Sequence, residues 1–391
     1  MALFEYSEKQ KQLKREVDEF LKNTMKQEVA DMFDPAGIFS LFTYPILREF
    51  NAKLGEKGWL LPWLPEEWGG MNLSNVDTLF LNDALLEHGA IAPLLIMNTG
   101  TSIVGPTLFR IGSEEQKKEF LPRIAKGEIE ICIGYSEPEA GTDLASLQMR
   151  AVEDGDSYVI NGQKRFQTAA HCADYHWLIV RTNPTVAKHK GLTLFMVDMK
   201  SPGITVSPMW CIGGEKMNEV FYDNVRVPKK NIVGEVNRGF VYVMMALQFE
   251  RNFPTGGMRW LFNKLVEFAR QFKLVRDPVA QNKIAEIATE LEVATLFSYR
   301  IASIFDEGKI PTYEVSMIKI FATEMYHRML NLGLWLMDSL GMMAVNSEWG
   351  RLAVRLQDLY QRSLPAHIGG GTNDMLRSYM VTRGFGLPSA W

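Results

Sequence analysis

The stretch that decides the fold runs from Ile131 to Thr168 and reads ICIGYSEPEAGTDLASLQMRAVEDGDSYVINGQKRFQT. It begins with an apolar, β-branched run over 131–135, which predicts a buried strand. Pro138 and Gly141 interrupt this run, so the loop over 136–143 keeps backbone N–H groups that regular structure does not use. Such amides, with small hydroxyl side chains beside them, suit an anionic, oxygen-rich ligand.

The second half of the stretch predicts further strands separated by tight turns. Asp154-Gly155-Asp156 and then Asn161-Gly162 are typical turn sequences. The stretch ends at Phe166 and Thr168, which offer an aromatic face and a hydroxyl. Loop and hairpin together predict a platform for a flat, phosphate-bearing cofactor. Each piece alone is equally typical of an ordinary β-domain.

The spacing of apolar residues divides the chain into three parts. Helical spacing dominates residues 1–128, a period of two dominates 129–236, and long helical patterns fill 237–391. The predicted fold class is therefore α+β and multidomain, with an N-terminal helical domain, a central β-domain and a C-terminal helical bundle.

Composition excludes several classes of function. The chain has 391 residues, of which 47% are hydrophobic, enough for a large core or several subdomains. A net charge of −4 without a long basic run argues against nucleic acid as a partner. The three cysteines and the histidines lack metal-ligand spacing, so no metal site is predicted. No apolar run reaches about 18 residues, and the N-terminus is charged, so we expect a cytoplasmic protein without a membrane span.

Four ordered motifs carry a resemblance to a known family. The sequences YSEPEAGTD over 135–143 and NGQKRFQT over 161–168 resemble the flavin-binding core of the acyl-CoA dehydrogenase family. DNVRVP over 223–228 and GGGTND over 369–374 resemble further signatures of that family, in the family's order. The resemblance covers nearly the whole chain. It implies the acyl-CoA dehydrogenase fold, with a β-barrel-like central domain and a C-terminal four-helix bundle.

The resemblance also implies a reaction. Family members bind FAD and oxidise an acyl-CoA thioester to the 2-enoyl-CoA: a carboxylate removes a proton from Cα while a hydride leaves Cβ for the flavin. Electrons then pass to an electron-transferring flavoprotein. Because the α-proton is weakly acidic, we expect the base to be a carboxylate in a dry pocket with a raised pKa.

Family members carry the base at one of two places. The first is the residue before the Gly-Thr near the C-terminus, which here is Gly370. The second is at the end of the helix that opens the C-terminal domain, directly before an arginine, which here gives Glu250 before Arg251. The resemblance therefore implies Glu250 as the base, and in the family this placement accompanies branched, long or bulky substrates. Glutamates on helices are more often solvated and paired with a cation, which is the plainer interpretation.

The neighbouring residues receive roles by the same resemblance. Arg251 would position the base and substrate, and the Gly370 N–H would donate to the thioester carbonyl, with Gly371 beside it. Such a donor acts as an oxyanion hole. The alternatives are a surface cation and a glycine-rich bend between helices. The residues expected to contact flavin are Tyr135, Ser136, Gly141, Thr142, Phe166, Thr168, Thr372 and Asp374. Phe166 stands where the family usually has tryptophan, and a plain core aromatic is its alternative reading.

Two segments depart from the family. Its usual Tyr-Ala-x-x-Arg-x-x-Phe-Gly-x-Pro, which reaches the flavin of a neighbouring subunit, is here FARQFKLVRDP over 268–278. Phe272 replaces the arginine and Val275 replaces the phenylalanine. The family's Gln-x-x-Gly-Gly is here DSLGM over 338–342. We therefore predict a hetero-oligomer, with a homologous partner chain that supplies the missing groups; a homotetramer with drifted contacts is the alternative.

Two rival functions remain open. An acyl-CoA oxidase has similar motifs, although its usual long C-terminal extension is absent here. A non-catalytic subunit that binds a catalytic homologue would explain the missing interface groups, whereas a carboxylate at Glu250 speaks against it.

Overall fold

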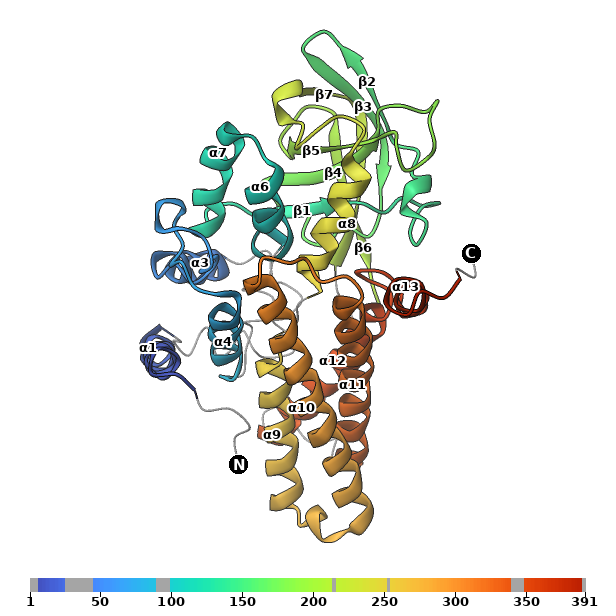
Figure 1. The fold of residues 1–391 in the computed structure, drawn as a ribbon. Coiled ribbons are helices and arrows are strands. Elements are labelled where there is room, and N and C mark those ends of the chain that lie inside the picture. Colours follow the sequence, from blue (N-terminus) through green and yellow to red (C-terminus); the bar gives the residue numbers. More distant parts are fainter. Residues whose placement is uncertain are drawn as a thin grey trace. The chain divides into compact units, whose positions relative to one another are not determined.

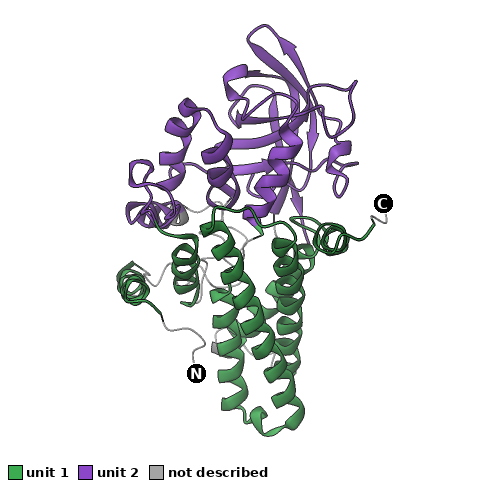
Figure 2. Ribbon diagram, in the orientation of Figure 1, with its two compact units in different colours: residues 1–41, 73–95, 251–391 green, residues 42–72, 96–250 purple. Residues whose placement is uncertain are grey.

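The computed structural model describes residues 6–24, 45–88, 99–212, 216–251, 254–338 and 348–388. The chain forms two compact units, drawn in different colours in Figure 2. Unit 1 combines residues 1–41, 73–95 and 251–391, and unit 2 combines 42–72 and 96–250. Segments far apart in sequence thus share a unit. The division into three domains over 1–128, 129–236 and 237–391 stays a prediction.

Unit 2 is built on a curled, seven-stranded sheet (Figure 1). Its strand order is β1-β4-β2-β3-β7-β6, and β5 pairs with β4 off this path. The β1–β4 pair is parallel, whereas β2–β3, β4–β5, β3–β7 and β6–β7 are antiparallel. The strands are β1 (Ile131–Gly134), β2 (Arg150–Asp154), β3 (Ser157–Lys164), β4 (Tyr175–Arg181), β5 (Leu192–Asp198), β6 (Ile204–Trp210) and β7 (Lys216–Pro228).

The apolar strands of this sheet are buried on both faces. Along β4, Trp177 and Ile179 join one core cluster, while Leu178 and Val180 join another. Successive side chains of a strand point to opposite faces, so this alternation places β4 between two cores. One core lies within the curled sheet, and the other is shared with helices. These helical elements are a π-helical turn (Gly100–Val104), α6 (Gly105–Ile111), α7 (Glu114–Ala125) and α8 (Gly239–Glu250). Helix α3 (Pro45–Glu56) also belongs to this unit.

Unit 1 is helical. Its long helices lie side by side in Figure 1 and bury apolar faces in two clusters, one around Leu265 and Met329 and one around Leu291 and Ile318. Among the described residues, no helix is both long and apolar enough to cross a membrane. The helices are α1 (Glu8–Thr24), α4 (Asn75–Leu86), α9 (Gly256–Gln271), α10 (Pro278–Asp306), α11 (Glu314–Met337), α12 (Glu348–Ala366) and α13 (Asn373–Gly384).

Local sequence signals set several of these boundaries. Ser113 begins α7 with a capping box, because its hydroxyl accepts from the N–H of Gln116 and the Gln116 side chain accepts from the N–H of Ser113. The hairpin turn between β2 and β3 falls at Gly155, as predicted. Apolar residues over 92–111 also predict a helix, and the structure describes this stretch only from residue 99.

One turn prediction is wrong. Asn161-Gly162 does not end a strand, because β3 continues through it to Lys164. The register against β7 shifts between Ile160 and Gly162, which makes this dipeptide a β-bulge. Gly162 has a φ of 141°, and a Cβ there would lie 2.7 Å from Cγ of Met149. Glycine is therefore required by the bulge and not by a hairpin turn.

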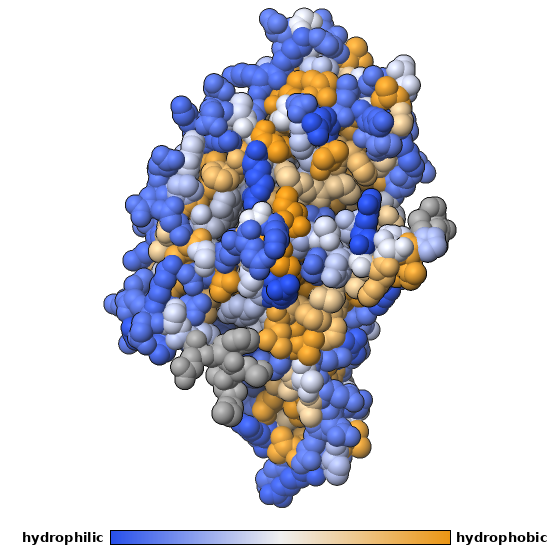
Figure 3. Space-filling view, in the orientation of Figure 1, coloured by the Kyte–Doolittle hydropathy of each residue, from blue (hydrophilic) through white to orange (hydrophobic). Residues whose placement is uncertain are grey.

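The surface is mostly hydrophilic with scattered apolar patches on the face drawn in Figure 3. Large exposed apolar residues include Trp210, Ile212 and Phe385. Single exposed apolar side chains are common on proteins, so these carry no function by themselves.

Candidate functional site

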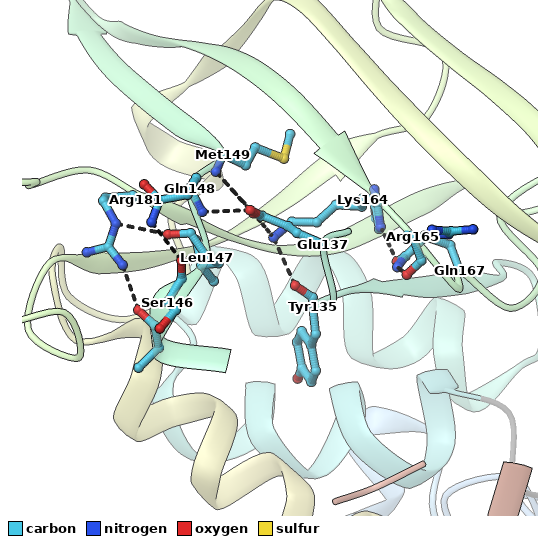
Figure 4. Close-up of polar contacts among 12 residues, drawn as sticks. Tyr135, Glu137, Ser146, Leu147, Gln148, Met149, Lys164, Arg165, Gln167 and Arg181 are labelled. Carbon is cyan, nitrogen blue, oxygen red and sulfur yellow. Dashed lines mark hydrogen bonds and ion pairs between the residues drawn. The ribbon is translucent and has the colours of Figure 1, made fainter. Parts of the chain in front are cut away.

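A buried ion pair fastens the loop over 136–143 to the sheet (Figure 4). Lys164, at the end of β3, is fully buried, and its Nζ lies 2.8 Å from Oε1 of Glu137, which is 7% exposed. Lys164 also donates to the carbonyl oxygen of Tyr135 at 3.0 Å. The Glu137 carboxylate accepts further hydrogen bonds from the N–H groups of Gln148 and Met149. One carboxylate and one ammonium thus join both halves of the loop to β3.

Two further contacts complete this support. The N–H of Arg165 donates to the carbonyl of Ser136 at 2.9 Å, which ties the segment after β3 to the start of the loop. Arg181 donates to the carbonyl oxygens of Ala145 and Leu147, where the loop turns towards β2. A guanidinium suits this task because its donors form a rigid fork.

Tyr135 is held firmly at the head of the loop. Its side chain is 9% exposed, and its hydroxyl accepts a hydrogen bond from Nε1 of Trp177 at 3.1 Å. Burial raises the pKa of the Tyr135 hydroxyl, and the negative charge of Glu250 raises it further. The Glu250 carboxylate therefore lies within electrostatic reach of the Tyr135 hydroxyl.

Glu250 is the last residue of α8 and is half-buried. Helix α8 packs on β5, on α6 and on the π-helical turn. The ring of the preceding residue, Phe249, lies under the guanidinium of Arg110, 4.5 Å from its centroid. This cation–π contact helps to fix the end of α8, where the carboxylate stands.

The loop itself leaves backbone donors open. Gly141 and Thr142 are exposed, and a Cβ at Gly141 would meet nothing within 4 Å. Among the described residues, the N–H groups of Gly141 and Thr142 donate to no protein acceptor. Ser136, Thr142 and Thr168 add hydroxyls. Open amides and hydroxyls beside free space can donate hydrogen bonds to the phosphate and ribityl oxygens of FAD. The loop therefore offers the kind of donors that this cofactor needs.

Phe166 presents an aromatic ring next to this loop region. Its side chain is 54% exposed, its backbone is left-handed with a φ of 62°, and the guanidinium of Arg165 lies 5.1 Å from the ring centroid. Thr168, two residues later, is half-buried. Of the expected residues of unit 2, the geometry thus brings Tyr135, Ser136, Phe166 and Thr168 to connected segments.

Unit 1 carries the glycine-rich segment. Arg251 is 6% exposed, and its Nε and Nη2 donate to the carbonyl oxygen of Gly370 at 2.9 and 2.7 Å. Lys319, buried on α11, donates to the carbonyl oxygen of Gly371 at 2.9 Å and to Oδ1 of Asn373 at 2.8 Å. Gly370 and Gly371 have φ values of 66° and 98°, conformations that favour glycine. Two cations therefore fix the orientation of two successive peptide groups.

The remaining two expected residues begin α13. Thr372 is its N-cap, because its hydroxyl accepts from the N–H of Met375 at 3.2 Å. The Asp374 side chain is 98% exposed and lies 3.7 Å from Arg377. The flavin contact expected of Asp374 stays a prediction.

Several supporting residues escaped the sequence analysis. Glu137 and Lys164 lie inside the quoted motifs, yet their pairing needs the loop and β3 to fold together. Asp83 on α4 accepts from the N–H groups of Thr255 and Gly256, at 2.6 and 2.7 Å, where α9 begins. Lys319 sits within an apolar helical pattern. A lysine in such a pattern could have indicated a supporting contact, since lysine is rarely buried without a partner.

Sequence profiles for the acyl-CoA dehydrogenase N-terminal, middle and C-terminal domains match residues 7–128, 132–225 and 237–385. The chain belongs to the acyl-CoA dehydrogenase family. Members of this family are FAD-dependent oxidoreductases, and the expected fold class is confirmed.

Full-length relatives support the assignment. Acyl-CoA dehydrogenase FadE26 of Mycobacterium tuberculosis is 33% identical, with 98% of each chain covered. The solved structure described as "Tcur3481-Tcur3483 steroid ACAD" is 31% identical, covers 100% of both chains and has a TM-score of 0.89. The ChsE4-ChsE5 complex from Mycobacterium tuberculosis is 32% identical, covers 100% of both chains and has a TM-score of 0.87.

A residue that differs from the family's interface motif, Phe272, packs within the helical bundle. Phe272, which stands where the family has arginine, packs against Phe268 and Trp349 with ring centroids 4.6 and 6.3 Å away. The neighbouring Arg270 and Arg276 are exposed. Of the second departing motif, only Asp338 lies within the described residues. The Phe272 side chain thus contributes to packing and offers no charged donor.

Proposed function

We propose that this member of the acyl-CoA dehydrogenase family oxidises an acyl-CoA thioester to the 2-enoyl-CoA, with FAD as cofactor. The observation that carries the proposal is the position of Glu250 at the end of α8. Its half-buried carboxylate lies within electrostatic reach of Tyr135, at the head of the loop over 136–143. FAD, when bound, supplies the acceptor for the hydride that leaves Cβ.

Glu250 takes the proton from Cα in this proposal. A carboxylate in a partly dry position is a stronger base than one in water, because burial disfavours its charged form. The family's other base position is occupied by Gly370, which has no side chain. Glu250 is therefore the candidate that both the motif and its burial support.

The glycine segment receives the substrate carbonyl. We assign the Gly370 N–H as the donor to the thioester oxygen, with Arg251 and Gly371 shaping the position. Arg251 binds the Gly370 carbonyl with two hydrogen bonds, so the adjoining peptide groups are fixed before substrate arrives. Fixed donors stabilise developing negative charge without reorganisation.

FAD is held, in this proposal, by four pairs of residues. Tyr135 and Ser136 contact the edge of the ring system, and the open amides of Gly141 and Thr142 bind phosphate. Aromatic cover and a hydroxyl come from Phe166 and Thr168, while Thr372 and Asp374 contribute from the start of α13.

A bulky acyl group is the proposed substrate class. The base at Glu250 rather than at Gly370 accompanies branched or bulky substrates in the family. Two relatives have names that point the same way: the steroid acyl-CoA dehydrogenase described above and a cyclohexane-1-carbonyl-CoA dehydrogenase of Geobacter metallireducens, which is 31% identical over 77% of this chain.

Two partners belong to this proposal. We propose an electron-transferring flavoprotein as the electron acceptor, and a hetero-oligomer with a homologous chain as the assembly. The aromatic packing of Phe272 supports the second point, because the side chain at the family's arginine position cannot bind a neighbour's phosphate. A cytoplasmic location also remains a prediction.

One experiment tests the proposed reaction. The FAD-loaded protein is mixed without oxygen with thioesters of linear, branched, aromatic and cyclic acids, and loss of the oxidised flavin absorbance is followed. We expect reduction with bulky thioesters and formation of the matching 2-enoyl-CoA. Reduction by none of them would overturn the proposed function.

Two alternatives give different results in related measurements. An oxidase would release peroxide under air at the rate of thioester oxidation, whereas a dehydrogenase would need an added electron acceptor. A partner subunit without its own catalysis is favoured by the altered 268–278 segment, and it would leave flavin oxidised with every thioester. Full FAD occupancy in a homotetramer purified alone would exclude the hetero-oligomer.

A further inference from the structure

The segment that follows β3 has a strained backbone. Phe166 and Ala169 have φ values of 62° and 61°, a left-handed conformation that residues with a side chain seldom adopt. Despite this strain, the Phe166 ring stands 54% exposed, so burial of the ring does little to hold it. Such conformations persist only where the surrounding structure determines them.

Gln167 holds this segment in its strained conformation, because all four of its polar groups are hydrogen-bonded. Its N–H donates to the carbonyl of Asn218 at 2.8 Å, and its own carbonyl accepts from Nδ2 of Asn218 at 2.9 Å. The side chain, 2% exposed, donates through Nε2 to the carbonyl of Arg165 and meets Nε2 of His176 at 3.2 Å through Oε1. Gln167 lies between Phe166 and Thr168, so it fixes both neighbours.

His176 anchors this glutamine from strand β4. Its ring is fully buried, and its Nδ1 lies 2.7 Å from the hydroxyl of Tyr222 on β7. Since Oε1 of Gln167 can only accept, Nε2 of His176 carries the proton, and Nδ1 accepts from the Tyr222 hydroxyl. Burial lowers the pKa of His176 to about 3, which keeps the ring neutral in this role.

The same ring abuts the strand that leads into the flavin loop. A Cβ at Gly134 would lie 2.5 Å from Nε2 of His176, so the histidine occupies the space that a side chain at Gly134 would need. Gly134 directly precedes Tyr135. One buried histidine therefore contacts two of the segments that carry expected flavin-binding residues or directly precede them.

We infer that Gln167 and His176 are positioning residues: they hold Phe166 and Thr168 in the geometry that receives the flavin. This inference rests on the proposed function only in naming the flavin as the ligand. Directional hydrogen bonds suit such a task, because apolar packing alone would let the strained segment relax. Neither residue touches the reacting atoms in this account.

The test uses three variants of the full chain in its native assembly. Gln167→Leu removes both side-chain hydrogen bonds, and Tyr222→Phe removes only the hydroxyl that donates to His176. Gln163→Leu is the matched control, because Gln163 also lies on β3 and its side chain donates to Glu219 at 3.0 Å. Two readouts are taken: hydrogen–deuterium exchange over residues 164–172 in the flavin-free protein, and the Kd for FAD.

Each readout has an expected outcome. Gln167→Leu should raise exchange in this peptide and raise the Kd for FAD roughly tenfold or more, since two hydrogen bonds are lost. Tyr222→Phe should shift both in the same direction by less, and Gln163→Leu should shift neither. Unchanged exchange and Kd in both test variants would overturn the inference.

The outcomes also separate this inference from the proposed function. If Gln167→Leu fails to fold, Tyr222→Phe decides alone, because it keeps the buried ring. If the wild-type protein binds no FAD, the proposed function fails, while exchange in the flavin-free protein still decides whether these residues hold the segment.

Discussion

Removing the buried ammonium of Lys164 should destabilise the protein strongly. In Lys164→Met, the Glu137 carboxylate stays 7% exposed and keeps only its backbone donors, and the carbonyl of Tyr135 loses a hydrogen bond. Breaking one partner of a buried ion pair costs about 3–5 kcal/mol, because a buried charge is left uncompensated. We expect a loss of the free energy of unfolding in that range.

The measurement is denaturant unfolding of the flavin-free protein, followed by circular dichroism. The double variant Lys164→Met/Glu137→Gln removes both charges and should lose about 1–3 kcal/mol less than the sum of the single variants. Lys229→Met is the matched control: its pair with Glu153 is exposed on both sides, so little change is expected. A loss below about 1 kcal/mol in Lys164→Met would refute the role given to this pair.

Three further predictions follow from single contacts. Burial raises the pKa of Asp83 to about 7. Between about pH 4 and 7, Asp83 is therefore protonated in the native state and ionised in the unfolded chain. Its contribution to the free energy of unfolding falls by up to about 4 kcal/mol as pH rises through this range. In denaturant unfolding, Asp83→Asn should therefore gain stability relative to wild type between about pH 4 and 7; a constant difference would contradict this. Gly134→Ala should force His176 aside and raise the Kd for FAD, measured by flavin fluorescence; an unchanged Kd would contradict the close contact. Arg251→Lys should lose the two-pronged bond to Gly370 and lower kcat about tenfold or more in steady-state assays; an unchanged kcat would contradict its positioning role.

The sequence predicted the elements better than their assembly. Strand β4 was visible because its residues are continuously apolar, as a strand buried on both faces requires. The bulge at Gly162 was mistaken for a turn, because Asn-Gly suits both and only the pairing with β7 distinguishes them. Likewise, periodicity could not show that α4 joins the C-terminal helices in one compact unit, since local patterns carry no long-range contacts.

For the site, too, the sequence predicted the motif residues but not the residues that support them. Motifs pointed to residues such as Phe166, whose ring is exposed. The groups that support them, Lys164, Gln167 and His176, were not assigned roles, because their partners lie on other strands.

The most direct test of the central claim is the half-reaction of Glu250→Gln. The FAD-loaded variant is mixed without oxygen with a thioester that reduces the wild-type flavin, and Glu235→Gln, an exposed glutamate, serves as control. If Glu250 removes the Cα proton, flavin reduction should slow by about 10²–10⁴-fold while the thioester still binds, and the control should react normally. Reduction of the Glu250→Gln flavin at the wild-type rate would show that another group is the base.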